Sequence, residues 1–169
     1  RVETPKGAWL HYSAEVPGQA ASELLPGLVN AALAALPIPR RMRWGDGDTE
    51  FVRPAHWVVM LLDTEIVPGT ILGLTPSRHT RGHRFHAPGP IELRSAADYS
   101  SVLAANSVIA DFAERRERVK ELAEAAATGV GGQAMIEADL LDEVTALVEW
   151  PVALTGCFDS TFLRLPEEV

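Results

Sequence analysis

The apolar pattern changes along this chain, and that change is the strongest constraint on its fold. Between residues 40 and 95, short apolar runs alternate with segments rich in glycine and proline, a pattern typical of strands and turns. After residue 95, apolar side chains recur mainly at helical spacing. Strands followed by helices predict an α+β protein rather than an alternating α/β one.

A β-hairpin is predicted at the centre of the strand-rich part. Residues 57–62 form an apolar run of strand length, Asp63 and Thr64 suit a turn, and residues 65–74 return as a second strand. Pro68 cannot donate a ladder hydrogen bond, so we expect this second strand at a sheet edge or with a bulge.

The other elements follow from periodicity and from breakers. Residues 78–90 are predicted to form a long loop, with a short strand at 91–93. Ser95 is expected to open a helix. The further predicted helices are 19–36 (starting near Glu23), 96–103, 108–127 and 139–148, and the further predicted strands are 8–14 and 152–158. Together they predict one domain over residues 1–169, with a small antiparallel or mixed sheet, a central hairpin and three to four packed helices.

Composition narrows the class of protein. Hydrophobic residues make up 47% of the 169 residues, enough for a core, and no apolar run reaches the roughly 18 residues that span a bilayer. The first residue is Arg1 rather than Met, so we expect a piece of a longer protein. Cys157 is the only cysteine, and a single cysteine fits a reducing compartment. We predict that its side chain is buried and packs as a small apolar group.

Residues 78–85 concentrate positive charge in an acidic chain. They hold three arginines and two histidines, whereas the formal net charge of the chain is -8. Cations gathered on an acidic protein usually face an anion, and the planar guanidinium group suits phosphate. This segment therefore meets a nucleic acid, a small phosphate or the protein's own carboxylates.

Several other chemistries are disfavoured. His79, His83 and His86 have helical spacing, but Gly82 and the nearby prolines argue against a helix, and a zinc site is not expected. The sequence has no Gly-x-Ser-x-Gly nucleophile motif and neither of the usual glycine-rich phosphate motifs. We predict no catalytic residue and no metal ligand.

Arginine and aromatic residues occur together in the first half of the chain. Arginine contacts phosphate and aromatic rings stack on unpaired bases, so this patch predicts contact with a nucleic acid. The alternative is that Arg53 and Arg84 pair with carboxylates of the domain and that Trp57 belongs to the core. The patch consists of Arg41, Arg43, Trp44, Arg53, Trp57, Arg81, His83, Arg84 and Phe85.

Five short motifs follow one another along the chain: Met42-Arg43-Trp44-Gly45; Phe51-Val52-Arg53-Pro54 with His56-Trp57; Thr80-Arg81-Gly82-His83-Arg84-Phe85; Val108-Ile109-Ala110-Asp111-Phe112 with Glu114-Arg115-Arg116; and Leu147-Val148-Glu149-Trp150-Pro151. In this order and spacing they closely resemble the β subunit of the bacterial tetrameric glycyl-tRNA synthetase. The resemblance covers nearly the whole chain, including Val2-Glu3-Thr4-Pro5-Lys6-Gly7.

The resemblance implies an α2β2 enzyme. Its α chain carries the class II catalytic core with ATP, magnesium and glycine, and its β chain handles much of the tRNA. This chain resembles an early part of β, with no cofactor of its own and without the anticodon-binding region. The implied partners are the α subunit, glycine tRNA and other β domains, with no membrane and no DNA, in the cytoplasm. Similarity to the editing-type domain of the phenylalanyl-tRNA synthetase β chain is also expected. The motif positions expected to contact RNA or α are Arg43, Arg53, Arg81, His83 and Arg84.

Three roles stay open. The domain is a tRNA-handling module without an active site, a structural scaffold that docks the α subunit, or a hydrolytic editing domain. Because glycine is the smallest amino acid, a size-excluding active site reduces the need for editing. The burial of Arg53, Arg81 and Arg84 separates the first two roles: exposed arginines favour RNA binding, and buried ion pairs favour the scaffold.

Overall fold

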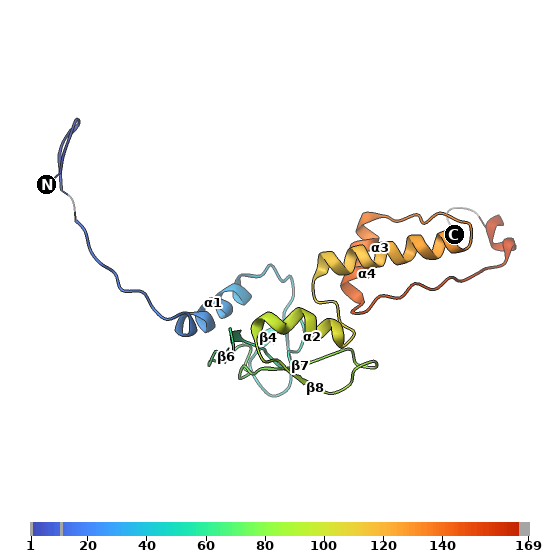
Figure 1. Ribbon diagram of the computed structural model, residues 1–169, viewed down its shortest axis with the longest axis horizontal. Helices are drawn as coiled ribbons and strands as arrows, with labels where there is room; N and C mark the ends of the chain where they lie inside the picture. Colours follow the sequence, from blue (N-terminus) through green and yellow to red (C-terminus); the bar gives the residue numbers. More distant parts are fainter. Residues whose placement is uncertain (1, 11, 166–169) are drawn as a thin grey trace. The chain divides into compact units, whose positions relative to one another are not determined.

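The computed structural model describes residues 2–10 and 12–165, and these contain four α-helices and four two-stranded antiparallel sheets (Figure 1). The α+β class is therefore confirmed. The expected single sheet is replaced by separate hairpins. Contacts divide the chain into two compact units, Arg1–His56 with Val67–Pro76 and Trp57–Ile66 with Ser77–Val169. No helix among the described residues is long and apolar enough to cross a membrane.

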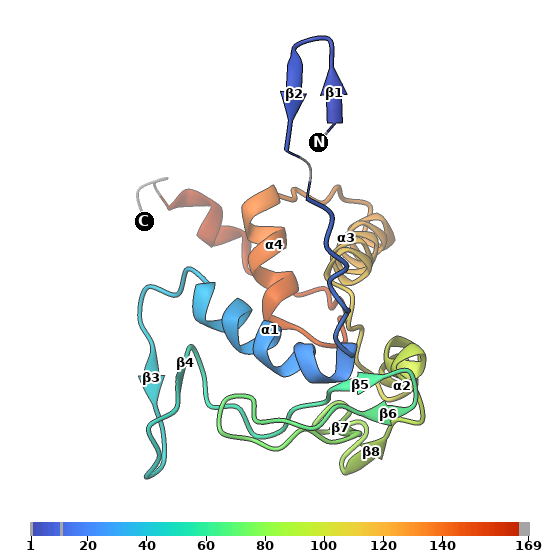
Figure 2. The same cartoon turned by 90° about the vertical axis from the view of Figure 1, so that its left-hand side faces the viewer.

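The first unit begins with a hairpin of β1 (Val2–Thr4) and β2 (Gly7–Trp9), visible in Figure 2, in which Glu3 faces Ala8. The strand predicted at 8–14 is thus present only at residues 8 and 9. His11 lies outside the described residues, and residues 12–20 have no regular structure.

Helix α1 (Ala21–Ala35) starts two residues before the predicted Glu23 and contains Pro26. The guanidinium of Arg41 donates hydrogen bonds to the carbonyl oxygens of Leu33 and Ala34, 3.3 and 3.0 Å away. A cation at this end satisfies carbonyls that the helix itself leaves unbonded. Arg41, a member of the predicted patch, therefore has a structural task.

A second hairpin in this unit pairs β3 (Met42–Arg43) with β4 (Glu50–Phe51), with Arg43 opposite Glu50. Gly45 adopts a φ of 63° in the connecting loop, a conformation that favours glycine. The segment that follows β6 in sequence buries Val67 and Ile71 and is tied to α1, because the amide of Asn30 donates to the carbonyl of Thr70 at 2.9 Å.

The central hairpin of the second unit is confirmed but short. Strands β5 (Leu61–Leu62) and β6 (Glu65–Ile66) pair across the predicted turn, where Asp63 has a φ of 53°. The prediction that the second strand continues to residue 74 is wrong. Pro68 has no N–H for a ladder, and residues 71–74 form a tight turn closed by two hydrogen bonds between Ile71 and Leu74.

The prediction that residues 78–90 form a loop is also wrong at both ends, because His79–Arg81 and Pro90 belong to strands. β7 (His79–Arg81) pairs with β8 (Pro90–Glu92), so only the connection between them is irregular. The short strand expected at 91–93 corresponds to β8. Leu93 is fully buried just beyond it, and its N–H donates to the carbonyl of Arg78 at 2.9 Å.

The helices of the second unit agree with the predicted periodicity apart from their ends, except that the last one, η2, was not predicted. They are η1 (Ala96–Asp98), α2 (Tyr99–Ala105), α3 (Phe112–Gly129), α4 (Ala138–Leu147) and η2 (Ser160–Arg164). Ser95 caps η1 as expected, and Asp111 caps α3 by accepting from the Glu114 N–H at 2.8 Å. Helix α3 therefore starts four residues later than predicted.

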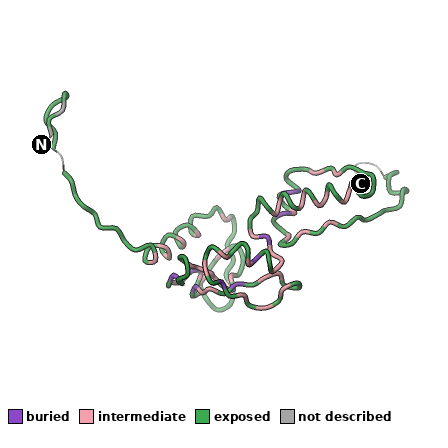
Figure 3. Tube along the Cα trace, in the orientation of Figure 1, coloured by how far each residue is buried: buried purple, intermediate pink, exposed green. Residues whose placement is uncertain are grey.

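Two predictions near the end of the chain are wrong. Residues 152–158 are not a strand, and Cys157 is exposed rather than buried. Buried positions are few along the trace in Figure 3, and the apolar ones include Val67, Ile71, Leu93, Leu103, Ile109 and Leu141. Many large apolar side chains stay exposed, among them Trp9, Leu10, Leu154 and Phe158.

Candidate nucleic-acid interface

Three of the five predicted RNA-binding residues lie together in the β7–β8 hairpin. Arg81 ends β7 opposite Pro90, and His83 and Arg84 follow in the connection. Arg43 and Arg53 lie in the other compact unit. The hairpin of the second unit is therefore the candidate interface, and Arg43 and Arg53 stay separate predictions.

Gly82 lets the hairpin connection approach the end of α2. A Cβ atom at this position would lie 2.8 Å from the carbonyl oxygen of Asn106 and 3.1 Å from the Cβ of Ala87. The next residue, His83, donates its N–H to that same Asn106 oxygen at 3.0 Å. The connection is thus held to α2 by a backbone hydrogen bond that requires a residue without a side chain at position 82.

His83 shapes the loop from within. Its Nδ1 atom accepts hydrogen bonds from the N–H groups of Phe85 and His86, at 3.2 and 3.3 Å, and its carbonyl accepts from Ala87 at 2.9 Å. The centre of its ring also lies 4.4 Å from the centre of the His86 ring. These bonds to the ring nitrogen and the carbonyl of His83 stabilise the turn that presents Arg84.

Arg81 and Arg84 are both exposed. The guanidinium of Arg81 lies 5.7 Å from the centre of the Trp57 ring, and cations are attracted to an aromatic face at this distance. Within the described residues, neither arginine pairs with a carboxylate. The alternative in which Arg84 forms an internal ion pair is therefore wrong.

The arginines of the first unit differ from each other. Arg43 forms an ion pair with Asp48 at 3.3 Å, and both side chains are largely exposed, so this pair contributes little stability. Arg53 is exposed and has no carboxylate partner within the described residues, which contradicts the predicted internal ion pair. All three arginines chosen to separate the two roles, Arg53, Arg81 and Arg84, are thus exposed.

Arg78, which opens the charged segment, has a structural role instead. It is partly buried and donates to the carbonyls of Thr64 and Leu93, at 3.0 and 3.4 Å. It therefore ties the β5–β6 turn to the end of the β7–β8 hairpin. Type and spacing alone did not separate Arg78 from its neighbours Arg81 and Arg84.

Trp57 is not the core residue that the apolar run suggested, because 46% of it is exposed. It lies at the edge of a pocket of about 440 Å³ within the second unit. The sequence did not predict this pocket, since its walls come from three segments far apart along the chain. Its lining residues are Trp57, Val59, Leu61, Thr80, Leu93, Ala96 and Tyr99.

A larger groove of about 650 Å³ runs beside α3. Its edge carries Glu114, Glu117 and Glu121, which recur at helical spacing, together with Arg118, and its apolar part includes Leu122 and Trp150. Among the described residues, no group of three His, Cys, Asp or Glu side chains is arranged to hold a metal ion.

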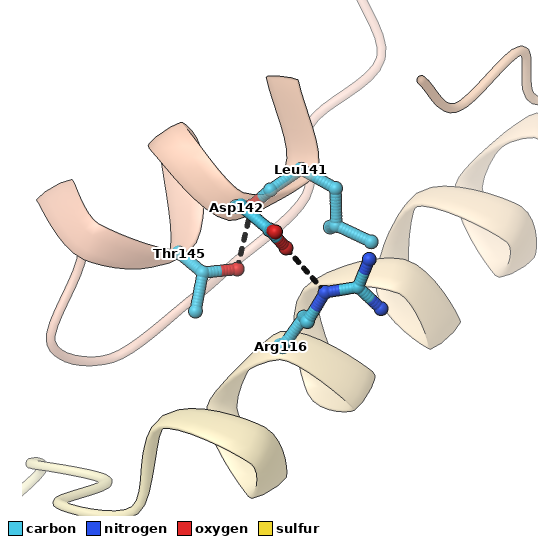
Figure 4. A network of polar contacts seen from close by, with 4 residues as sticks. All are labelled: Arg116, Leu141, Asp142 and Thr145. Atoms are coloured by element: carbon cyan, nitrogen blue, oxygen red, sulfur yellow. Dashed lines mark hydrogen bonds and ion pairs between the residues drawn. The ribbon is translucent and has the colours of Figure 1, made fainter. Parts of the chain in front are cut away.

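Polar side chains join α3 to α4 and lie within α4 at this contact. Arg116 of α3 pairs with Asp142 of α4, and the hydroxyl of the buried Thr145 donates to the carbonyl of Leu141 at 2.7 Å (Figure 4). Arg115, the neighbouring arginine, donates to backbone carbonyls. No spacing signal distinguishes these two arginines from Arg118, which pairs only within α3.

Comparison with known proteins places this chain in a family. Residues 1–169 match the family model described as glycyl-tRNA synthetase beta subunit. The chain belongs to the glycyl-tRNA synthetase β-subunit family. The resemblance of its five motifs is thereby confirmed.

Relatives in this family are similar over almost the whole chain. The glycine–tRNA ligase beta subunits of Chromohalobacter salexigens, Marinobacter nauticus and Serratia proteamaculans are 53%, 50% and 48% identical to it over 167, 169 and 169 residues. These alignments cover 99% of this chain and 24% of each relative. The chain thus spans about a quarter of the length of the β-subunit relatives it matches.

Proposed function

We propose that this chain acts within a glycine–tRNA ligase, the enzyme that attaches glycine to its tRNA with ATP, as a module that contacts tRNA and has no active site of its own. Membership of the β-subunit family supports the parent activity. In this proposal the α subunit binds ATP, magnesium and glycine, and other β domains complete tRNA recognition.

The exposed pair Arg81 and Arg84 carries the proposal. Arg81 ends β7, Arg84 lies in the connection that His83 and Asn106 hold in place, and neither is neutralised by a carboxylate within the described residues. Because the protein as a whole is acidic, an uncompensated pair of guanidinium groups favours an anion with closely spaced charges. The phosphate backbone of RNA has that property, and backbone contacts position a protein without reading sequence.

The test uses the full-length β subunit assembled with α. Arg81→Ala and Arg84→Ala are each expected to weaken binding of glycine tRNA, and each lost phosphate contact is expected to reduce the salt slope of log K by about 1. Lys120→Ala is the matched control, because it removes one positive charge from α3 rather than from the hairpin. Native affinity and an unchanged salt slope in both arginine variants would contradict the proposal.

A second candidate role, docking of the α subunit, rests on the groove beside α3. Glu117 and Glu121 pair with Lys120 and Arg118, but the three glutamates of the lining still outnumber its one cation and so complement a positively charged segment. The lining also offers the apolar surface of Leu122 and Trp150. We propose that a basic segment of α occupies this groove.

Charge reversal tests the docking role. Glu117→Lys together with Glu121→Lys is expected to raise the dissociation constant of α from β in sedimentation experiments. Glu124→Lys, on the same helix but outside the groove lining, serves as the control. If the double variant and the Glu124→Lys control bind α with equal affinity, α docks elsewhere.

A further inference from the structure

The pocket behind the β7–β8 hairpin is lined by uncharged side chains, so its chemistry differs from that of the exposed arginines. Its walls are aliphatic at Val59, Leu61 and Leu93, and aromatic at Trp57 and Tyr99, which are 46% and 40% exposed. The lining contains no charged side chain. The volume of about 440 Å³ falls within the range of roughly 300–1,000 Å³ that is usual for small-ligand sites.

One polar group within this pocket is available to a ligand. Thr80 is only 6% exposed and lines the pocket, yet within the described residues its hydroxyl has no hydrogen-bond partner. No buried side-chain nitrogen or oxygen atom among the described residues lacks a partner, so the Thr80 hydroxyl stays accessible to solvent although the residue as a whole is nearly buried. A pocket with two aromatic side chains, an accessible hydroxyl group and no charged side chain in its lining suits a flat, uncharged group with hydrogen-bonding edges.

Strand geometry places this pocket directly behind a phosphate-binding candidate. Successive side chains of β7 alternate between faces, so Thr80 is buried while its neighbours His79 and Arg81 are exposed. Arg81 in turn lies over Trp57, which lines the pocket. A phosphate bound at Arg81 would therefore hold its nucleotide at the mouth of the pocket.

We propose that the pocket lined by Trp57, Thr80 and Tyr99 accepts an unpaired nucleobase of the tRNA whose phosphate lies at Arg81. This proposal rests on the proposed tRNA contact and names the part of the RNA that is recognised. Unpaired bases stack on aromatic side chains, and the hydroxyl of Thr80 can bond to a base edge.

The first test measures affinity. Tyr99→Ala in the full-length enzyme is expected to weaken glycine tRNA binding by about 10- to 100-fold, the usual loss for one stacked base, without changing the salt slope. Tyr99→Phe keeps the ring and should retain affinity. Tyr12→Ala is the matched control, because Tyr12 is the other tyrosine of the 169 residues and is 88% exposed.

The second test locates the base. Chemical probing of glycine tRNA in complex with the enzyme should show one unpaired base that is protected by the native protein and reactive with Tyr99→Ala. Thr80→Val, which preserves shape and removes the hydroxyl, should weaken binding without abolishing the protection. Thermal unfolding of each variant, expected to match the native protein for Tyr99→Phe, controls for loss of fold.

The outcomes separate this inference from the proposed function. If the arginine variants lower the salt slope while Tyr99→Ala and Thr80→Val bind normally, the pocket does not hold a base although the hairpin contacts RNA. If Tyr99→Ala and Thr80→Val weaken tRNA binding but the arginine variants do not, the proposed phosphate contacts of Arg81 and Arg84 do not exist. If Tyr99→Ala instead weakens assembly with α and leaves tRNA affinity unchanged, the pocket holds a protein side chain and the inference is overturned.

Discussion

Arg115 at the start of α3 donates its Nε hydrogen to the carbonyl oxygen of Thr145 near the end of α4, at 2.9 Å. The same guanidinium bonds to the carbonyls of Ile109 and Ala110, and it lies over the ring of Phe112 at 5.6 Å. A single side chain therefore joins α4, the start of α3 and the segment before it. Its planar fork of donors suits three carbonyls at once.

Replacement of Arg115 should loosen the α3–α4 pair. Arg115→Met keeps much of the side-chain length but leaves partly buried carbonyls without donors, so we expect a loss of about 2–4 kcal/mol in the free energy of unfolding. Urea denaturation of the second unit's helices, followed by circular dichroism, measures it. Arg118→Met on the same helix removes only an exposed ion pair and should change stability by less than about 0.5 kcal/mol. Equal losses for both variants would contradict the assigned role.

Gly82→Ala tests the close approach between the hairpin connection and α2. The new Cβ would overlap the carbonyl oxygen of Asn106, so the His83 to Asn106 hydrogen bond must lengthen or break. We expect destabilisation by about 1–3 kcal/mol and faster exchange of the His83 amide proton. Gly156→Ala, where nothing lies within 4 Å of the added atom, should behave like the native protein. Unaltered exchange at His83 would show that the loop has room to move.

Leu93→Ala probes the core of the second unit. Leu93 is fully buried beside β8, and its truncation should lower the free energy of unfolding by about 2–5 kcal/mol, because it removes apolar contacts and leaves a cavity. Leu154 is 90% exposed, so Leu154→Ala should change stability by less than about 0.5 kcal/mol. A thermal unfolding series of both variants distinguishes the two positions. A small effect at Leu93 would mean that the surrounding residues collapse into the space.

Asp159 should show a pH-dependent contribution to local structure. Its carboxylate accepts from the Thr161 N–H at 2.8 Å and from the Thr161 hydroxyl at 2.7 Å, and these bonds, the backbone one first, lower its pKa below the ordinary value. Because the pKa is lower in the folded state, the stabilisation of η2 is present above the unfolded pKa. It is lost as the pH falls through the folded pKa.

The two hydrogen bonds of Asp159 can be separated by substitution. Carbon-13 titration of the Asp159 carboxyl group should give a midpoint below that of a model aspartate. Thr161→Ala retains the backbone donor, so the midpoint should rise only part of the way. A complete return to the model value would assign the shift to the hydroxyl instead.

The elements that sequence predicted best are those whose stabilising contacts are local. Helices α2, α3 and α4 were expected close to their observed positions, because apolar spacing and caps such as Ser95 lie within the segment itself. The strands were predicted less well. β7 was taken for loop because a three-residue strand has too few positions to show alternation, and its partner β8 lies beyond a long connection.

The strand predicted at residues 152–158 is absent for a different reason. Their composition suits a strand, but no strand pairs with them among the described residues, and a strand without a neighbour has no hydrogen-bonding partner for its backbone. Trp57 is a second case in which local composition gave the wrong prediction. The apolar run around it predicted burial, whereas folding places Trp57 beside Arg81 at the edge of a pocket.

The sequence by itself determined the family, the α+β class and the concentration of cations at residues 78–85, since motifs, periodicity and charge are properties of neighbouring residues. Only the tertiary structure decided what each cation does. Arg78 binds backbone carbonyls, the ring of His83 shapes the connection, and Arg81 and Arg84 stay exposed. The physical reason is that a side chain's partners are set by segments far away in sequence, here Thr64, Leu93 and Asn106, whose approach no local pattern encodes.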